Sequence, residues 1–154
     1  MSYCMLNGPS EHFSWEEVTG SDTATSQGIA NDIPPAYQVN AVALAQVLER
    51  VRFKLNEGMP VPVIVHVNSW YRSPALNVAV RGCPNSWHTK GLAADIWVQG
   101  WEQQALAEFV KAVFEECVPW GTYEIKTYDS MVHVALKDDG TPSEFLTNAT
   151  SPLV

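Results

Sequence analysis

Two apolar, strand-like segments each carry an ionisable residue near their middle, and this feature restricts most strongly how the chain can fold. Asp95 lies within the apolar run 92–98, and His133 lies between two valines in the run 131–136. An ionised carboxylate buried in such a strand is costly unless it is paired or bound to a metal. We therefore expect a fold in which both strands are largely buried and each polar side chain meets a partner.

The surrounding segments predict helices and further strands. Apolar residues in 37–55 recur at three- and four-residue steps, which is typical of a helix with one buried face. Ser73 and Pro74 fit an N-cap and a first helical position, and Ser14 with Glu17 has the spacing of a capping box. The expected elements are helices over 37–55 and 102–117, a short helix from Pro74 to Gly82, and strands over 63–68, 92–98, 123–128 and 131–136. Their order indicates an α+β fold with a small, largely antiparallel sheet and flanking helices.

Size and charge limit the classes of protein to consider. The chain has 154 residues, 46% of them hydrophobic, which suits one folded domain over 1–154 with its core in about 10–137. Nine Lys and Arg against seventeen Asp and Glu leave a net charge of −8. That balance argues against nucleic acid and against an anionic membrane as partners. We expect a monomer.

The cysteines and the N-terminus indicate synthesis in a cytoplasm. Cys4, Cys83 and Cys117 form an odd, sparse set without CxxC spacing, which predicts free thiols. No apolar run approaches the roughly 20 residues of a membrane span. Residues 1–13 lack the basic start and apolar core of a signal peptide.

A third residue completes a candidate metal-ligand set. His88 stands seven residues before Asp95 in a segment rich in turn-forming residues. Two histidines and one carboxylate are a common three-ligand set for a catalytic zinc, with the fourth position left for water. The spacing alone leaves other interpretations open: a strand histidine is often a satisfied core residue, and Asp95 can instead pair with Arg72.

The residues around this set resemble a known family. The matching positions are Tyr71-Arg72-Ser73-Pro74, then Ser86, His88, Gly91, Ala93 and Asp95, then a late histidine in the apolar run Val132-His133-Val134. The pattern resembles the zinc D-alanyl-D-alanine carboxypeptidase and L-alanyl-D-glutamate endopeptidase family of peptidoglycan hydrolases, which has a hedgehog-like fold. The resemblance covers roughly residues 10–137. The opening segments 12–14 and 21–24 also look like the short phage and prophage members, which suggests an endolysin.

The resemblance implies a zinc-dependent peptidase. By this resemblance, His88, Asp95 and His133 would bind Zn²⁺. Metal-activated water would then hydrolyse an amide bond in the peptidoglycan stem peptide. Arg72 would stabilise the developing oxyanion or hold a substrate carboxylate, because its guanidinium offers a fixed fork of donors. The enzyme would act on the cell wall, after phage-mediated release.

Further residues of the motif would contact the substrate. Ser86 would help to seat the stem peptide near the metal, and Tyr71 and Trp87 would line the cleft. Trp70 can serve there as well, or these tryptophans can be core packing.

The sequence departs from the family pattern at the general base. Many relatives carry an acid three residues before the last histidine, where this chain has Ser130. Asp129 is closest to the usual position, and Glu124 is the rival. If Asp129 and Ser130 form a two-residue turn, Lys126 pairs opposite His133 and Glu124 lies diagonally on the same face. If the loop is longer, Asp129 can turn in towards the metal. The departure also permits a catalytically weak or inactive zinc-binding module for wall recognition or the virion.

Overall fold

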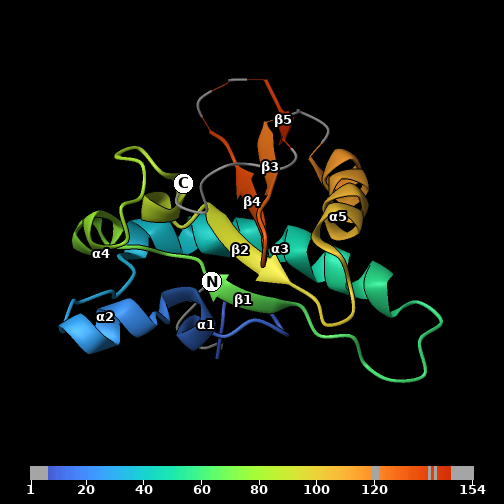
Figure 1. Cartoon of the computed structure of the whole chain (residues 1–154), viewed down its shortest axis with the longest axis horizontal. Helices are drawn as coiled ribbons and strands as arrows, with labels where there is room; N and C mark the ends of the chain where they lie inside the picture. The colour runs from blue at the N-terminus through green and yellow to red at the C-terminus, as the bar shows by residue number, and fades with distance from the viewer. Residues whose placement is uncertain (1–6, 119–121, 139, 141, 147–154) are drawn as a thin grey trace.

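The computed structural model describes residues 7–118, 122–138, 140 and 142–146, which fold into an α+β arrangement (Figure 1). Within this part of the chain, five strands form one sheet in the order β1-β2-β4-β3-β5. The helices are α1 (Trp15–Thr19), α2 (Asp22–Gln27), α3 (Pro35–Asn56), α4 (Pro74–Ala79) and α5 (Gln103–Cys117), with a 3₁₀ turn, η2 (Trp87–Lys90). The strands are β1 (His66–Ser69), β2 (Ala93–Trp97), β3 (Tyr123–Thr127), β4 (Val132–Leu136) and β5 (Glu144–Leu146). The predicted fold class is confirmed.

The sheet register fixes which side chains share a face. β2 and β3 both pair antiparallel with β4, so Asp95 lies opposite His133 on one side and Lys126 lies opposite it on the other. The Tyr128 amide donates to the Met131 carbonyl at 2.9 Å, which closes a tight turn around residues 129 and 130. Of the two arrangements that the sequence left open for this hairpin, the two-residue turn is therefore the one present. Since side chains alternate along a strand, Asp95 and His133 point away from the apolar face of the sheet.

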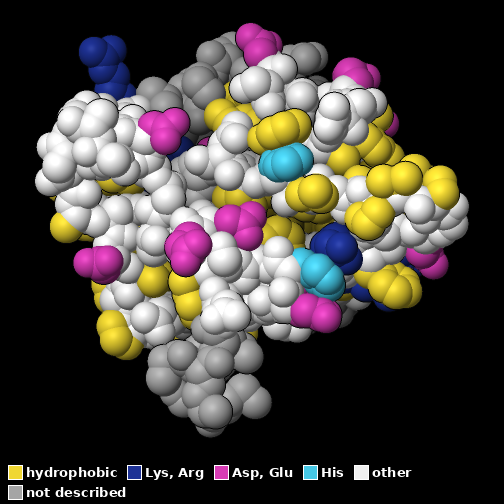
Figure 2. All heavy atoms as spheres, turned by 90° about the horizontal axis from the view of Figure 1, so that it is seen from below, with side chains coloured by type: hydrophobic (Ala, Val, Ile, Leu, Met, Phe, Trp, Pro, Cys, Tyr) yellow, Lys and Arg dark blue, Asp and Glu magenta, His cyan; other side chains and the backbone are white. Residues whose placement is uncertain are grey.

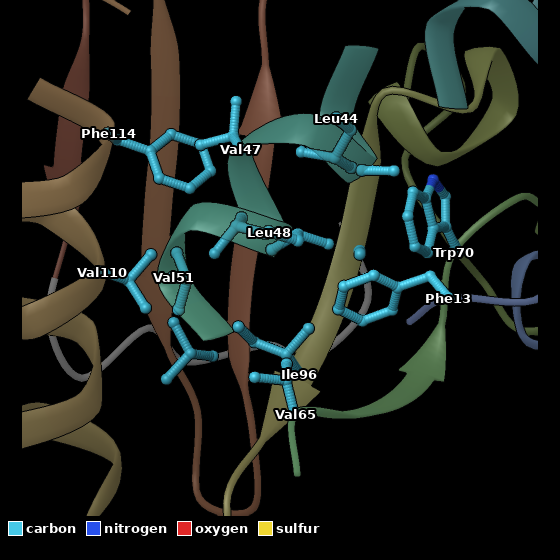
Figure 3. Close-up of a cluster of buried hydrophobic side chains, with 14 of the residues drawn as sticks. Phe13, Leu44, Val47, Leu48, Val51, Val65, Trp70, Ile96, Val110 and Phe114 are labelled. Carbon is cyan, nitrogen blue, oxygen red and sulfur yellow. The ribbon is translucent and has the colours of Figure 1, made fainter. Parts of the chain in front are cut away.

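The opposite face of the sheet builds the core against α3 and α5. The helix α3 begins with a proline at its first turn and buries a stripe that includes Leu44, Leu48 and Val51. These side chains meet Ile96 of β2 and Phe114 of α5, both fully buried (Figure 3). The predicted helical periodicity of residues 37–55 thus reflects burial against the sheet.

Some elements differ from the sequence prediction. The strand expected from residue 63 begins only at His66, because Val63 instead exchanges two hydrogen bonds with the side chain of Asn56 at the end of α3. The helix α2, the turn η2 and the strand β5 were not expected. Each spans only three to six residues, which is too short to show a recognisable periodicity.

The N-terminal helices are tied to the rest of the fold through Asn31. The capping box of Ser14 and Glu17 is present at the start of α1. The Asn31 amide donates to the carbonyls of Thr19 at 2.9 Å and Tyr71 at 3.0 Å, and its carbonyl accepts from the Ser73 amide at 2.6 Å. One side chain therefore joins α1, the segment after β1 and the start of α4.

Exposed hydrophobic side chains gather at the end of α3 and in the loop leading to β1 (Figure 2). Among them Val61 is 69% exposed and Ile64 58%. No helix in the described part of the chain has the length and hydrophobicity needed to cross a membrane. Cys117 is a free thiol, Cys83 is exposed, and Cys4 lies outside the described residues.

Candidate metal centre

Three elements bring His88, Asp95 and His133 together in the interior. The ring of His88 comes from η2, the carboxylate of Asp95 from β2 and the ring of His133 from β4. Asp95 Oδ1 lies 3.3 Å from His88 Nε2 and 3.1 Å from His133 Nδ1. All three residues are at most 1% exposed, and one ligand atom of each lies within 4.8 Å of the others. The two histidines and the aspartate thus meet as a possible metal site.

The orientation of His88 fits this use. Its Nδ1 lies 2.6 Å from the Trp70 carbonyl, which can only accept, so Nδ1 carries the proton and donates. The other nitrogen, Nε2, is buried without a hydrogen-bond partner. A buried polar atom without a partner is costly, and a metal ion would satisfy it. The Asp95 carboxylate and two imidazoles are ligands that zinc commonly takes.

The local backbone holds His88 in place. Ser86 caps the 3₁₀ turn by accepting a hydrogen bond from the His88 amide at 3.2 Å. Gly91 ends the turn with φ +74°, in the left-handed region that favours glycine. The sequence then enters β2, which carries Asp95 four residues later. Gly91 thus provides the change of chain direction between the two candidate ligands.

The charges in the cluster perturb one another. Burial alone would raise the pKa of Asp95, but the neighbouring His88 and His133 outweigh it and hold this pKa well below its usual range. Burial lowers the pKa of His88 despite the nearby carboxylate. Burial also acts to lower the pKa of His133, yet its hydrogen bonds to Asp95 and Glu124 raise it. The lowered pKa of Asp95 and the raised pKa of His133 thus share one cause, the hydrogen bond between the two side chains.

Arg72 reaches the same carboxylate from the segment after β1. Its Nη2 lies 3.4 Å from Asp95 Oδ2, its Nε donates to Ser69 Oγ at 3.2 Å, and its Nη1 contacts Asn77 Oδ1 at 3.4 Å. A side chain at Gly82 would collide with Asn77, so the glycine permits this packing. Asp95 thus contacts both Arg72 and the two histidines, so its two interpretations hold at the same time.

The two candidate general bases lie in different surroundings. Glu124 is 8% exposed, and its Oε1 lies 2.9 Å from Nε2 of His133, the ring nitrogen that points away from the cluster. Asp129 is exposed at the turn between β3 and β4. Glu124 therefore contacts a candidate ligand, whereas Asp129 is exposed to solvent beside Ser130.

A cleft of about 300 Å³ reaches the cluster at Asp95, while His88 and His133 do not line it. Arg72 and Asp95 lie in its wall, and the start of α2 forms part of its rim. The other residues that line it are Ser21, Asp22, Thr23, Asn68, Ser69, Leu76, Val80, Ser130 and Met131. A substrate in this cleft would lie beside both the Arg72 guanidinium and the Asp95 carboxylate.

The remaining candidate residues are not among those that line the cleft. Trp70 is fully buried in the core, where its Nε1 donates to the Gly91 carbonyl, so its interpretation as packing is the correct one. Tyr71 is 3% exposed and contacts Tyr37. Ser86 is 4% exposed at the start of η2, and Trp87 is half-buried with Lys90 over its ring. Three of these four candidates are therefore buried, and only Trp87 is partly exposed to solvent.

The sequence did not single out Tyr128, which lies near Asp95 and Glu124. The Tyr128 hydroxyl is buried without a hydrogen-bond partner, and burial together with the charges of Asp95 and Glu124 raises the pKa of this phenol. Its position could have been anticipated, because Tyr128 follows Glu124 and Lys126 at two-residue steps and so shares their face of the hairpin.

The comparison with known proteins agrees with this arrangement. The model of the family described as Peptidase M15 matches residues 11–135, which is most of the chain. The matched range includes all three residues of the buried cluster. No curated protein matches the sequence.

Proposed function

Because this chain belongs to the peptidase M15 family, we propose that it is a zinc-dependent peptidase that hydrolyses an amide bond in the peptidoglycan stem peptide. The observation that carries the proposal is the buried set of His88, Asp95 and His133, in which Nε2 of His88 makes no hydrogen bond. We propose the cell wall as the place of action and peptidoglycan as the partner. Carboxypeptidase and endopeptidase activities are both compatible with this site.

The proposed roles follow from the positions of the side chains. His88, Asp95 and His133 would hold Zn²⁺, which when bound polarises a carbonyl and lowers the pKa of a coordinated water. Arg72 lies in the cleft wall and would hold a substrate carboxylate or the developing oxyanion with its planar fork of donors. Ser130 lines the cleft, and the adjacent exposed Asp129 is the acid that can accept a proton from that side.

Restoration of activity by zinc tests the proposal. The purified protein is stripped of metal, reloaded with Zn²⁺ and incubated with purified muropeptides, and the products are identified by mass spectrometry. We expect cleavage only after reloading, and none for His88→Ala. His12→Ala is the matched control, because His12 pairs with Glu49 at the surface, away from the cluster, and should cleave like wild type. Absence of cleavage by the zinc-loaded wild type would refute the proposed reaction.

A second candidate function is a zinc-binding wall-recognition module without catalysis. The observation that favours it is the position of the acids: Glu124 contacts the outward nitrogen of His133, and Asp129 is exposed at the turn. A general base must lie within hydrogen-bond reach of its proton, directly or through one water. This alternative predicts that zinc-loaded protein sediments with insoluble peptidoglycan but releases no fragments. Release of stem-peptide fragments would exclude it.

A further inference from the structure

His133 is hydrogen-bonded through both of its ring nitrogens. Nδ1 lies 3.1 Å from Asp95 Oδ1, inside the cluster, and Nε2 lies 2.9 Å from Glu124 Oε1, on the other side of the ring. A carboxylate can only accept a hydrogen bond, and an imidazole must be neutral to bind a metal. A neutral ring has one N–H, and both nitrogens of His133 face a carboxylate. If a metal ion is bound by the cluster, Nδ1 gives it the lone pair, and the remaining proton lies on Nε2 and is donated to Glu124.

We infer that Glu124 is a positioning residue, which selects the Nε2–H tautomer of His133 and thereby makes Nδ1 its metal-binding atom. This inference rests on the proposed zinc site. It gives Glu124 a role other than that of general base, because its carboxylate lies on the side of the ring away from the cluster. Metal-binding histidines commonly donate their second N–H to a carboxylate or a carbonyl, which fixes the tautomer and the ring orientation.

The two histidines of the cluster are oriented in opposite senses. In His88 the Trp70 carbonyl holds the proton on Nδ1 and leaves Nε2 for the metal. In His133 the Glu124 carboxylate holds the proton on Nε2 and leaves Nδ1. His88 on η2 directs Nε2, the nitrogen farther from its backbone, toward Asp95. His133 on β4 directs Nδ1, the nitrogen nearer its backbone, toward the same carboxylate. Each ring therefore needs an acceptor of its own behind it.

The sheet holds Glu124 at the required place. Lys126 lies opposite His133 and Glu124 lies opposite Ala135, so Glu124 is the diagonal neighbour of His133 on the same face. The ammonium of Lys126 lies 3.6 Å from Glu124 Oε1 and partly neutralises the buried carboxylate. Removing Glu124 would leave the outward nitrogen of His133 without its acceptor, and the ring would no longer be restricted to one tautomer.

Nuclear magnetic resonance of the ¹⁵N-histidine-labelled, zinc-loaded protein tests the inference directly. We expect His133 to bind zinc through Nδ1 and to show a slowly exchanging Nε2–H, while His88 binds through Nε2 and carries its proton on Nδ1. Binding of zinc through Nε2 of His133 would overturn the inference without affecting the proposed zinc site. A wild-type protein that binds no zinc would overturn both.

Variants supply a second measurement, the zinc affinity determined by competition with a chelator. For Glu124→Ala we expect a loss of about 10- to 100-fold and a rapidly exchanging His133 N–H. Glu124→Gln should recover part of the affinity, because its amide oxygen still accepts from Nε2–H. Asp138→Asn changes an exposed acid just after β4 and should leave the zinc affinity and the His133 signals unchanged. Wild-type affinity in both Glu124 variants would refute the positioning role, and far-ultraviolet circular dichroism checks that each variant is folded.

Discussion

Replacement of Asn31 by alanine tests how the N-terminal helices are held against the site. Asn31 is 9% exposed and makes three hydrogen bonds, two as donor and one as acceptor, to backbone groups from three different segments. Each such bond contributes about 1 kcal/mol net. Since alanine cannot replace any of them, we expect Asn31→Ala to lower the free energy of unfolding by about 3 kcal/mol.

The expected loss is large enough to measure in urea. With a denaturant slope of about 2 kcal/mol/M, a loss of about 3 kcal/mol lowers the unfolding midpoint by about 1.5 M. Asn40→Ala is the matched control, because the Asn40 amide makes one bond, to the Lys90 carbonyl at 2.9 Å, and its loss should be about 1 kcal/mol. Equal midpoints for the two variants would show that the three bonds of Asn31 do not add, and would refute the reasoning.

Three further predictions concern the site and its supports. Gly91→Ala should destabilise the fold by about 1–2 kcal/mol in urea unfolding, because φ is +74° and the new Cβ would lie 3.0 Å from the Tyr37 carbonyl; an unchanged midpoint would contradict this. If the proposed activity holds, Arg72→Lys should lower kcat/KM on a stem peptide by on the order of 100-fold, since lysine has no planar fork of donors; wild-type kinetics would exclude the role. Asp95 has a lowered pKa, so its stabilisation of the metal-free protein should be present above about pH 4 and lost as the pH falls further, and urea unfolding of Asp95→Asn should show a weaker acid dependence.

Much of the site could be predicted because its residues interrupt regular patterns. Asp95 and His133 stand out as polar residues in apolar strands, and both are buried in the cluster. A two-residue turn at Asp129 and Ser130, one of two arrangements that the sequence left open, implies that Lys126 pairs with His133 and that Glu124 lies on the same face, as the register shows. These are local properties, because a strand alternates its faces every residue and a short turn sets the register.

Other properties of the site depend on contacts between distant parts of the chain. Trp70 belongs to the buried core and offers its carbonyl to His88, eighteen residues away, although its position beside the motif also suggested a cleft residue. Asp129 was preferred to Glu124 as the general base because it is closer to His133 in the sequence. In the structure Glu124 is buried and Asp129 is exposed, a difference that sequence distance does not predict.

The sequence thus establishes which residues can bind a metal, because their chemistry and strand periodicity are local. The tertiary structure establishes how they meet. Asp95 and His133 are 38 residues apart and become neighbours only because β2 pairs with β4. The nitrogen that each histidine turns toward the cluster follows from the acceptor behind its ring, Trp70 for one and Glu124 for the other. A hydrogen bond extends only about 3 Å, so these choices are made by packing.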